Sequence, residues 1–386
     1  MALDLETREQ LIDMVRRFVA ERLRPIEAKV AEDDAVPAEI IEEMKGLGLF
    51  GLSIPEEFGG LGLNMEEECL VGIELGRASP AFRSAFGTNV GIGSQGLVMF
   101  GTDAQKAKWL PGIASGEIVT SFALTEPEAG SDTARIQTRA IRRNGKYYLT
   151  GQKVFTSRAL HSDLMLVLAR TTPYEEVENK TEGMSIFIVD LRNARGGLVI
   201  RPIEVMVNHQ TNAVYFDELE VPAENLIGEE GKGFRYLLDG LNAERILIAA
   251  ECIGDGRWFI DRVVRYANRR VVFGRPIGQN QGVQFPIARA HALVEAADLM
   301  RWKAAWLYDQ GQRCGAEANL AKLLASDASW YAANVCLDVH GGMGFVVEMD
   351  VERKFRETRL YQVAPVNNNL VLAYIGQHVL GLPRSY

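Results

Sequence analysis

The first third of the chain repeats apolar residues at helical spacing, with charged residues on the opposite face. The first repeat is made by Leu11, Val15, Phe18, Val19 and Leu23. Similar patterns predict helices at 38–49, 66–77, 90–100 and 103–110. A loop at 55–62, which its glycines allow to turn tightly, lies between two of these helices. We therefore expect a helical N-terminal domain over residues 1–117.

Near Gly116 the pattern changes to short apolar runs, which are typical of β-strands. Asn144-Gly145-Lys146 has the composition of a hairpin turn between two of them. The charged stretch 171–181 predicts an exposed loop. The predicted strands are 118–124, 147–149, 164–169, 184–189, 198–203 and 213–216. Together they predict a small antiparallel β domain or barrel over residues 118–229.

A second helical block follows the glycine-rich segment 228–233. Its first helix is predicted to be long, from 234 to 272, and to be weakened at Gly254 and Gly256. Further helices are predicted at 284–311, 316–339 and 369–380. The C-terminal domain, residues 230–386, is therefore expected to be helical. The fold class is α+β, in the order helical, β, helical.

Length and composition describe an ordinary globular protein. At 386 residues the chain is too long for one small core, which predicts two or three domains. Hydrophobic residues make up 47% and charged residues 24%, and the net charge of −9 argues against a broad nucleic-acid or anionic membrane surface. The four cysteines are widely spaced without a C-x-x-C pair, so neither a disulfide framework nor a zinc site is implied.

The sequence also bears on location and metals. No apolar run approaches the roughly 20 residues of a membrane span, and the acidic start of the chain does not resemble a leader peptide. We expect a bacterial cytoplasmic protein, or a mitochondrial matrix protein if it is eukaryotic and processed. His161, His209 and His291 are interpreted as structural, because no pair has metal-ligand spacing. No metal is expected.

The most informative stretch is 122–132. An apolar strand ends at Thr125, and Pro127 turns the chain toward Gly130, Ser131 and Asp132. A strand end followed by a glycine-containing turn presents several backbone N–H groups, which can bind an anion or a ring carbonyl. The alternative is an ordinary turn in which Ser131 and Asp132 bond their own backbone.

Five motifs in this order and spacing together resemble the acyl-CoA dehydrogenase family of flavoenzymes, over essentially the whole chain. They are 55–62 (PEEFGGLG), 125–132 (TEPEAGSD), 151–157 (GQKVFTS), 270–276 (RVVFGRP) and 340–345 (HGGMGF). One such motif is weakly specific, whereas five in order are highly specific. The resemblance implies FAD as the cofactor. It also implies an N-terminal helical domain, a central antiparallel β domain and a C-terminal four-helix bundle.

The resemblance assigns the β domain to the flavin. Thr125 is expected to bond the O2/N3 edge of the ring, and Ser131 to reach the pyrophosphate or the 3′-phosphate side of coenzyme A. Phe155 and Ser157 are expected near the ring, with Ser157 near N5, although the family usually has Trp-Ile-Thr at 155–157. The alternative for Phe155 is a core aromatic. The expected flavin-binding residues here are Phe122, Leu124, Thr125, Gly130, Ser131, Phe155, Thr156 and Ser157.

The remaining cofactor residues are expected in the C-terminal domain. In the family, the arginine and glutamine that match Arg270 and Gln281 come from a neighbouring subunit and hold the pyrophosphate and adenosine. A guanidinium suits this because its fork meets two phosphate oxygens. The resemblance therefore implies a homotetramer, or at least a dimer; the alternative is a solvated arginine pair and a glycine turn. The full expected set is Arg270, Phe273, Gln281, Asp338, Gly341, Gly342, Asn367 and Asn369.

The catalytic base departs from the commonest family pattern. Abstraction of a proton α to a thioester requires a desolvated carboxylate. Pro365 occupies the position where most members carry this glutamate, and it also lacks the backbone N–H that helps polarise the thioester carbonyl in the family. Isovaleryl- and long-chain-type members carry the base on the long helix instead, which points to Glu244. Asn242 and Arg245 are the expected substrate contacts beside it, together with Ser131.

The alternative for Glu244 is a surface position, and Glu251, seven residues on, is the fallback base or an ion-pair partner. The leading hypothesis is an acyl-CoA dehydrogenase of fatty-acid β-oxidation that forms a trans-2-enoyl-CoA and passes electrons to an electron-transfer flavoprotein. Two alternatives stay open at this point. One is an oxidase or monooxygenase-like relative that uses O₂, and the other is a non-catalytic acyl-CoA- or flavin-binding relative.

Overall fold

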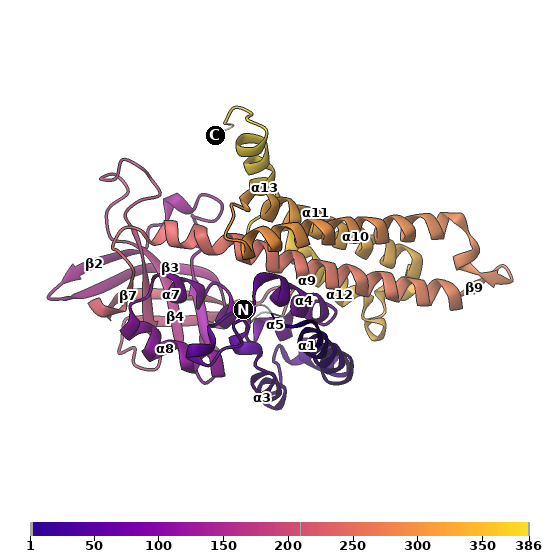
Figure 1. Ribbon diagram of the computed structural model, residues 1–386, viewed down its shortest axis with the longest axis horizontal. Helices are drawn as coiled ribbons and strands as arrows, with labels where there is room; N and C mark the ends of the chain where they lie inside the picture. Colours follow the sequence, from indigo (N-terminus) through magenta and orange to yellow (C-terminus); the bar gives the residue numbers. More distant parts are fainter. Residues whose placement is uncertain (1–2, 209, 385–386) are drawn as a thin grey trace. The chain divides into compact units, whose positions relative to one another are not determined.

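The computed structural model describes residues 3–208 and 210–384 (Figure 1). His209 lies outside the described residues, so the interpretation given to it above is not addressed. The chain forms two compact units, which are described separately. Unit 1 comprises Met1–Asp33, Asn64–Arg83 and Asn242–Tyr386, and unit 2 comprises Asp34–Leu63 and Ser84–Leu241. No helix in the described ranges is long and apolar enough to cross a membrane.

Unit 2 is built around one mixed sheet, in which β1 pairs with β4 and the other strands follow the order β6-β7-β3-β2-β4-β5-β8. Most pairs are antiparallel as expected, but β4 pairs in parallel with β1 and, at one residue, with β2. The hairpin at Asn144-Gly145 joins β2 to β3, with φ of 50° and 74° at the two turn residues. The strands are β1 Thr120–Ala123, β2 Arg139–Arg143, β3 Lys146–Ser157, β4 Leu164–Arg170, β5 Met184–Asp190, β6 Leu198–Pro202, β7 Thr211–Pro222 and β8 Leu226–Ile227.

The centre of this sheet is buried on both faces. Leu164, Leu166 and Leu168 of β4 pack with the side chains of α8, while Met165 and Val167 of the same strand join the core on the other face. Such a strand needs apolar residues at every position rather than at alternate ones. The helices of unit 2 are α3 Ala38–Gly46, α6 Gly87–Val90, α7 Gln95–Phe100, α8 Asp103–Ser115 and the first part of α9. The stretch 171–181 forms no helix or strand, as expected.

Unit 1 is helical. Its α4 begins with a capping box, in which the Asn64 side chain accepts from the Glu67 N–H and the Glu67 side chain accepts from the Asn64 N–H. A two-stranded ribbon, β9 Val271–Val272 and β10 Arg275–Pro276, joins two of the long helices. The helices are α1 Leu5–Phe18, α2 Glu27–Asp33, α4 Met65–Leu75, α5 Pro80–Ser84, α9 Gly233–Arg269, α10 Gln281–Asp309, α11 Gly315–His340, α12 Val351–Thr358 and α13 Asn368–Tyr374.

The long helix α9 is continuous through the glycines that were expected to weaken it. A Cβ on Gly254 would lie 2.0 Å from the carbonyl oxygen of Ile73, and one on Gly76 would lie 2.4 Å from the carbonyl oxygen of Glu251. Both glycines therefore allow the backbones of α4 and α9 to approach closely. The expectation of weak points is wrong, because close packing against α4 compensates for the low helix propensity of glycine.

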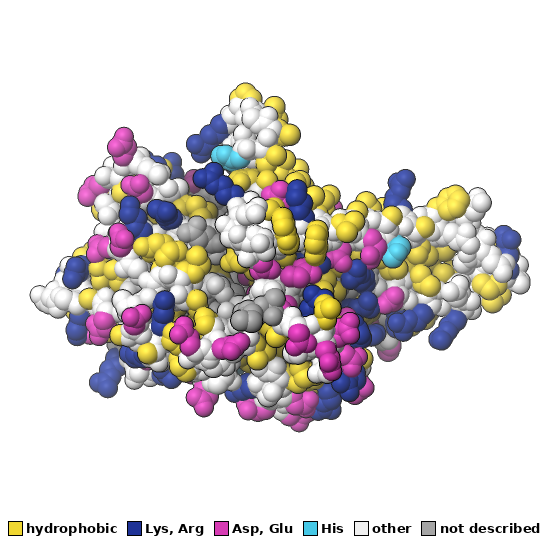
Figure 2. Space-filling view, viewed as in Figure 1, with side chains coloured by type: hydrophobic (Ala, Val, Ile, Leu, Met, Phe, Trp, Pro, Cys, Tyr) yellow, Lys and Arg dark blue, Asp and Glu magenta, His cyan; other side chains and the backbone are white. Residues whose placement is uncertain are grey.

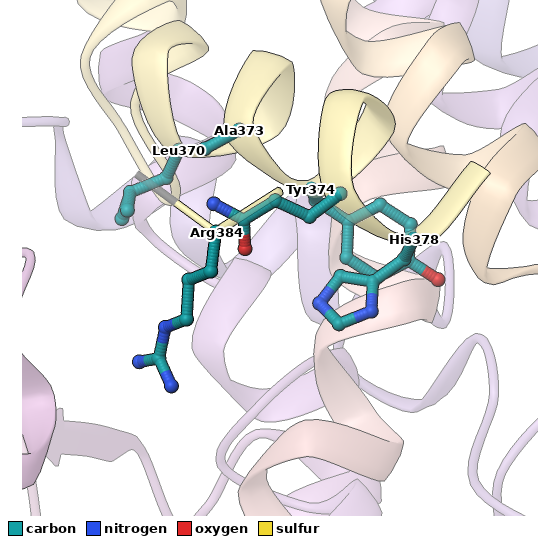
Figure 3. Close-up of a pocket in the computed structure, with 6 residues that line it drawn as sticks. Leu370, Ala373, Tyr374, His378 and Arg384 are labelled. Atoms are coloured by element: carbon teal, nitrogen blue, oxygen red, sulfur yellow. The ribbon is translucent and has the colours of Figure 1, made fainter. Parts of the chain in front are cut away.

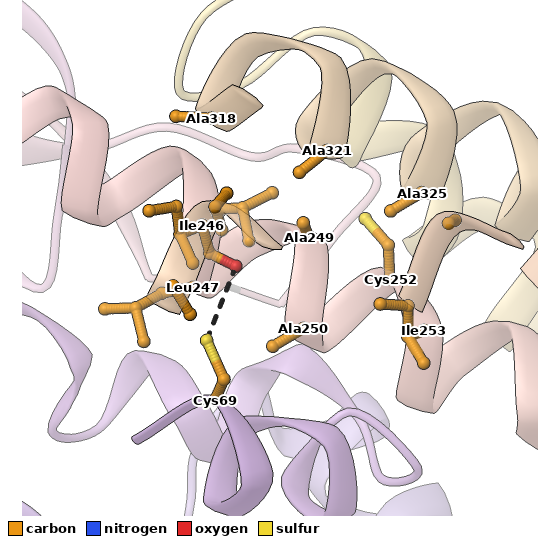
Figure 4. Close-up of a cluster of buried hydrophobic side chains, with 14 of the residues drawn as sticks. Cys69, Ile246, Leu247, Ala249, Ala250, Cys252, Ile253, Ala318, Ala321 and Ala325 are labelled. Carbon is orange, nitrogen blue, oxygen red and sulfur yellow. Dashed lines mark hydrogen bonds between the residues drawn. The ribbon is translucent and has the colours of Figure 1, made fainter. Parts of the chain in front are cut away.

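The core of unit 1 brings α4 against α9, α10 and α11. Cys69 on α4 packs among Ile246, Ala250 and Ile253 of α9, and its Sγ lies 3.9 Å from the carbonyl oxygen of Ile246 (Figure 4). Small residues of α11, among them Ala318, Ala321 and Ala325, complete the cluster. All four cysteines are buried and none forms a disulfide. This core fixes the part of α9 that carries Glu244.

Candidate functional site

In unit 2 the structure brings two of the sequence motifs together. The backbone N–H of Val154 donates to the carbonyl oxygen of Thr125 at 2.8 Å, so the stretch that follows β1 lies against the end of β3. Phe122, Leu124 and Thr125 are half-buried there, and the ring of Phe122 packs on the core beneath them. The two stretches expected to contact a flavin are therefore neighbours.

A break in strand pairing presents Phe155 outward. The register between β3 and β7 shifts between Lys153 and Thr156, and Phe155 has a φ of 57° in the left-handed region. As a result its side chain is 63% exposed, while Thr156 is buried and Ser157 half-buried. The alternative of a core aromatic at Phe155 is wrong. An irregular pairing at this point turns the aromatic side chain away from the core.

A buried ion pair supports the wall that residues 122–125 and 154–157 form. Lys153 is fully buried, and its Nζ donates to Glu126 Oε1 at 2.9 Å and to the carbonyl oxygen of Leu124 at 2.8 Å. The Glu126 carboxylate also accepts the N–H groups of Gln137 at 2.7 Å and Thr138 at 2.9 Å. Burial lowers the pKa of Lys153 to about 8, against the raising effect of Glu126. Burial acts to raise the pKa of Glu126, but Lys153 and the N–H donors hold it below its usual value.

The turn after Glu126 is open to solvent. Glu126 and Ala129 exchange backbone hydrogen bonds of 3.1 Å, which closes the turn. Gly130 and Ser131 follow and are both exposed, and no atom lies within 4 Å of where a Cβ of Gly130 would stand. The expected contact residues of this turn are therefore accessible to a ligand.

In unit 1 Glu244 is buried, at 8% exposure, so the surface alternative is wrong for this residue. Arg83 at the end of α5 donates from Nη2 to Glu244 Oε1 at 3.2 Å. The second oxygen, Oε2, has no hydrogen-bond partner among the described residues. A buried carboxylate with one oxygen held and the other free is suited to accepting a proton.

Glu251 lies on the same face of α9, as the spacing predicts. Its Oε1 pairs with Arg83 Nε at 2.8 Å, and its Oε2 accepts from the Tyr361 hydroxyl at 3.4 Å. Burial raises the pKa of Glu251 to about 7; Arg83 opposes this shift and Glu244 adds to it. Burial also raises the pKa of Tyr361 well above its usual value. Glu251 is thus an ion-pair partner of Arg83.

The expected substrate contacts stand beside Glu244 in the sequence and in space. Arg245 donates from Nη1 to Asn242 Oδ1 at 3.2 Å, which joins the two residues one helical turn apart. Burial lowers the pKa of the Arg245 guanidinium. Both side chains are half-buried.

The segment around Pro365 offers no carboxylate. Pro365 is exposed in the loop before α13, and the Asn367 side chain caps that helix by accepting from the Leu370 N–H at 3.0 Å. Asn369 is exposed. The buried Lys322 of α11 fixes the loop, since its Nζ donates to the carbonyl oxygen of Val366 and to Asn368 Oδ1, both at 2.7 Å.

The other expected cofactor residues gather at the far end of the long helices. Tyr266 near the end of α9 stacks on His340 at the end of α11, with ring centroids 4.0 Å apart. The expected residues in and beside these helix ends are all exposed: Arg270, Phe273, Gln281, Asp338, Gly341 and Gly342. Glu244 lies on α9 roughly 40 Å away at about 1.5 Å per residue, so the structure does not bring this group to Glu244 within one chain.

A separate hollow of about 330 Å³ lies at the C-terminal segment (Figure 3). Leu370, Ala373, Tyr374, His378 and Arg384 line it, and the rings of Tyr374 and His378 are 5.0 Å apart. None of the residues predicted from the sequence lines this hollow. Within residues 3–208 and 210–384, no group of three or more His, Cys, Asp and Glu residues is arranged to hold a metal ion.

No role for Arg83 was predicted from the sequence. Lys153 was included only within the motif 151–157 and Lys322 only within the predicted helix 316–339, and neither lysine was given a role of its own. Arg83 is separated from Glu244 by 161 positions, so no spacing signal links them. Lys153 stands inside the motif at 151–157, in which it is the single charged residue. Its pairing with Glu126 explains how these two charged side chains can both be buried.

The wall in unit 2 has the chemistry that a flavin requires. Phe155 offers an exposed aromatic face, and the hydroxyls of Thr125 and Ser157 offer donors and acceptors on either side. Gly130 leaves the backbone open at the adjoining turn. These residues fit the face and the polar edge of the ring.

Comparison with known proteins agrees with the family resemblance found in the sequence. Family models match the chain over residues 5–117 (acyl-CoA dehydrogenase, N-terminal domain), 121–219 (middle domain) and 231–380 (C-terminal domain). An acyl-CoA dehydrogenase of Bacillus subtilis (strain 168) is 35% identical over 379 residues, which cover 97% of this chain and 99% of that protein.

Solved structures of related proteins also match this chain over nearly its whole length. Butyryl-CoA dehydrogenase from Megasphaera elsdenii superposes with a TM-score of 0.91 at 28% identity, covering 98% of this chain and 100% of that one. The prolyl acyl carrier protein oxidase AnaB superposes with a TM-score of 0.92 at 26% identity, covering 99% of this chain and 100% of that one. With three domain models matched in order and full-length identity above 30%, the chain belongs to the acyl-CoA dehydrogenase family of FAD-dependent oxidoreductases.

Proposed function

We propose that this enzyme dehydrogenates an acyl-CoA thioester to the trans-2-enoyl-CoA, with Glu244 as the base. The observation that supports this most directly is the state of the Glu244 carboxylate. It is buried on α9, Arg83 holds Oε1, and Oε2 is without a partner among the described residues. Pro365 removes the other position at which most family members carry a base.

In this proposal the α C–H bond breaks and its proton goes to Glu244 Oε2. FAD, when bound, supplies the acceptor for the hydride that leaves the β carbon. Asn242 and Arg245 contact the substrate next to the base, and Ser131 contacts its coenzyme A portion or the pyrophosphate. Thr125, Phe155 and Ser157 would hold the ring, together with Phe122, Leu124, Gly130 and Thr156. Burial of the base helps, because a desolvated carboxylate is a stronger base toward a weakly acidic C–H bond.

The thioester oxygen also needs stabilisation as charge develops on it. Pro365 has no N–H to donate. We propose that a donor other than residue 365 carries this interaction, beside the hydroxyls that the cofactor would offer when bound. One such donor contributes about 10²–10³ in rate in other enzymes, which makes the replacement a requirement for normal turnover.

We also propose that the functional form is a homotetramer, or at least a dimer, in which Arg270 and Gln281 bind the cofactor of a neighbouring subunit. Arg270, which directly follows α9, is too far from Glu244 along the helix axis for both to serve one cofactor within a chain. Several apolar side chains at the same end of the helices and along α10 are solvent-exposed, and Figure 2 shows hydrophobic side chains on the surface of the long helices. They include Val271, Phe273, Phe285, Leu299, Trp302 and Trp306.

The same proposal divides the chain into three domains. Residues 1–117 form the N-terminal helical domain, and residues 118–229 form the β domain that carries the flavin wall. Residues 230–386 form the C-terminal helical domain, which carries the base, the adenosine contacts and the surface for oligomerisation. Asp338, Gly341, Gly342, Phe273, Asn367 and Asn369 belong to the adenosine and flavin contacts. An electron-transfer flavoprotein is the proposed acceptor, and fatty-acid breakdown in a bacterial cytoplasm the proposed setting. These assignments rest on the family pattern.

An anaerobic titration with acyl-CoAs of different chain length and branching tests the proposal through the flavin absorbance. We expect one class of acyl-CoA to bleach the wild type and not Glu244→Gln. Glu74→Gln is the matched control, because Glu74 is equally buried in the same unit and pairs with Arg16 and Arg77. Bleaching of Glu244→Gln at the wild-type rate would assign the base to another residue, with Glu251 next in line.

A second candidate is an acyl oxidase that uses O₂, which the likeness to a prolyl acyl carrier protein oxidase favours. Oxygen uptake in the absence of any added acceptor separates the two. Reoxidation of the bleached enzyme by O₂ within the turnover time would favour the oxidase. Slow reoxidation that an electron-transfer flavoprotein accelerates would favour the dehydrogenase.

A further inference from the structure

Among the described residues, Arg83 is the only cation that pairs with Glu244. The same guanidinium also pairs with Glu251. Nη2 contacts Glu244 Oε1 at 3.2 Å and Nε contacts Glu251 Oε1 at 2.8 Å. The guanidinium fork thus bridges two buried carboxylates that lie two helical turns apart on one face of α9. A lysine could not make this arrangement, because its single ammonium lacks the rigid fork.

The charges around this bridge do not balance. Glu244 and Glu251 together carry two negative charges when ionised, and Arg83 offers one positive charge. Asp255, one turn further on, is already neutralised by Lys354 at 2.5 Å and accepts from Ser329. The Tyr361 hydroxyl faces Glu251 and donates to it. The titratable groups that face Arg83 and the two glutamates are therefore Asp255 on α9, Tyr361 after α12, and Lys354 and Glu357 on α12.

We propose that Arg83 is a positioning residue for the base: its guanidinium lies against Glu244 and occupies Oε1, so that Oε2 takes the substrate proton, and Glu251 adjusts this effect by competing for the same guanidinium. The inference rests on the proposed function, since it concerns the base of that reaction. Glu251 makes the closer of the two contacts with the guanidinium, 2.8 Å against 3.2 Å, and burial together with the neighbouring Glu244 still raises the pKa of Glu251 to about 7.

The two partners predict different changes. Without Arg83, two buried carboxylates face each other with no cation between them, and one binds a proton up to a higher pH. The acid limb of the bleaching rate should then move to higher pH by about 1–3 units, the usual effect of an adjacent opposite charge. Because the pKa of Glu251 is about 7, its charge competes for Arg83 only above neutral pH. Glu251→Gln should therefore match the wild type on the acid side and bleach more slowly at high pH, where Arg83 acts on Glu244 alone and the base is weaker.

The experiment measures the rate of anaerobic flavin bleaching against pH for the holoenzyme and four variants. They are Arg83→Gln, Arg83→Lys, Glu251→Gln and the control Arg77→Gln, whose arginine pairs with Glu74 and Asp261 instead. We expect Arg83→Lys to restore part of the shift, and Arg77→Gln to reproduce the wild-type profile. A merely structural role for Arg83 would lower the rate equally at every pH.

A second measurement does not need turnover. The infrared carbonyl band of protonated carboxylic acids is followed against pH in the substrate-free holoenzyme. The band that Glu251→Gln removes should titrate near neutral pH in the wild type, and Arg83→Lys should move its midpoint upward. This reading keeps the inference testable if Arg83→Gln does not fold.

The outcomes separate the two levels of inference. If Glu244→Gln stops bleaching but the profiles of the Arg83 and Glu251 variants superpose on the wild type, the positioning role is overturned and the base assignment stands. If Glu244→Gln bleaches normally, the proposed base is overturned, and the infrared titration alone then decides whether Arg83 couples the two carboxylates. A shift of the acid limb to higher pH in the Arg83 variants, together with a rate of Glu251→Gln that falls below the wild type only at high pH, supports the inference.

Discussion

Replacing Lys153 with methionine would remove the cation beneath the proposed flavin wall with little change in side-chain volume. In the wild type Nζ joins Glu126 and the carbonyl oxygen of Leu124 at 2.9 and 2.8 Å. The variant leaves both acceptors without this donor in a buried site. Removing one partner of a buried ion pair costs about 3–5 kcal/mol. Glu126 keeps the N–H donors of Gln137 and Thr138, so we expect the lower end, about 3 kcal/mol.

The same strand provides a matched control. Lys146 of β3 pairs with Glu220 of β7, but both side chains are about half exposed. Lys146→Met should leave the free energy of unfolding unchanged within error, because solvent already screens that pair. The double variant Lys153→Met with Glu126→Gln should recover part of the loss, since it removes the unpaired charge.

Urea unfolding followed by circular dichroism gives the free energies. Flavin retention on gel filtration gives a second reading, since Leu124 and Thr125 belong to the proposed flavin contacts. If Lys153→Met destabilised the protein no more than Lys146→Met, the reasoning about the buried pair would be refuted. Loss of stability with full flavin retention would limit the role of the pair to folding.

Two further predictions concern α9. Gly254→Ala should destabilise the protein by about 1–3 kcal/mol or more, because the new Cβ would lie 2.0 Å from the carbonyl oxygen of Ile73. Gly240→Ala on the same helix is the control, because its Cβ would meet nothing within 4 Å. In thermal unfolding this control should be neutral or slightly stabilising. Glu251 has a raised pKa of about 7 against 4.5, so the folded state binds its proton more tightly and its contribution to stability falls as the pH rises between these values. Glu251→Gln should therefore remove about 3 kcal/mol from the stability difference between pH 4.5 and 7, measured as the change in unfolding free energy relative to wild type.

The sequence predicted the elements that have a strong apolar pattern. β4 and β5 agree with the predicted 164–169 and 184–189 to within a residue, because burial on both faces requires an unbroken apolar run. β2 was missed. Of Arg139–Arg143 only Ala140 is buried, so the strand carries no such run and depends on pairing with β3.

Helix α12 was missed for a related reason. Its buried positions include Arg353, Lys354 and Glu357, which are charged and neutralise one another and their neighbours. A search for apolar spacing cannot find a helix whose inner face is ionic. Burial of charge is decided by partners such as Glu27 and Asp255, which lie far away in the sequence.

The candidate site was predictable as residue types in motifs, and not as geometry. The outward turn of Phe155 depends on the irregular pairing between β3 and β7, which its motif does not encode. The contact of Arg83 with Glu244 depends on tertiary packing of α5 against α9. Motifs identify residue types at fixed spacing along the chain, whereas contacts made between distant parts of the chain leave no local pattern.

The discontinuity of unit 1 has a consequence for how the protein is made. The Cys69 face of α4 is covered by α9, and the two contacting residues are 177 positions apart. At about 5–20 residues per second, a ribosome needs roughly 10–35 s to synthesise the segment between them. Throughout that interval the apolar side of α4 is exposed on the nascent chain, while the strands of unit 2 are already emerging. We therefore expect the growing polypeptide to depend on a holdase chaperone until α9 leaves the exit tunnel.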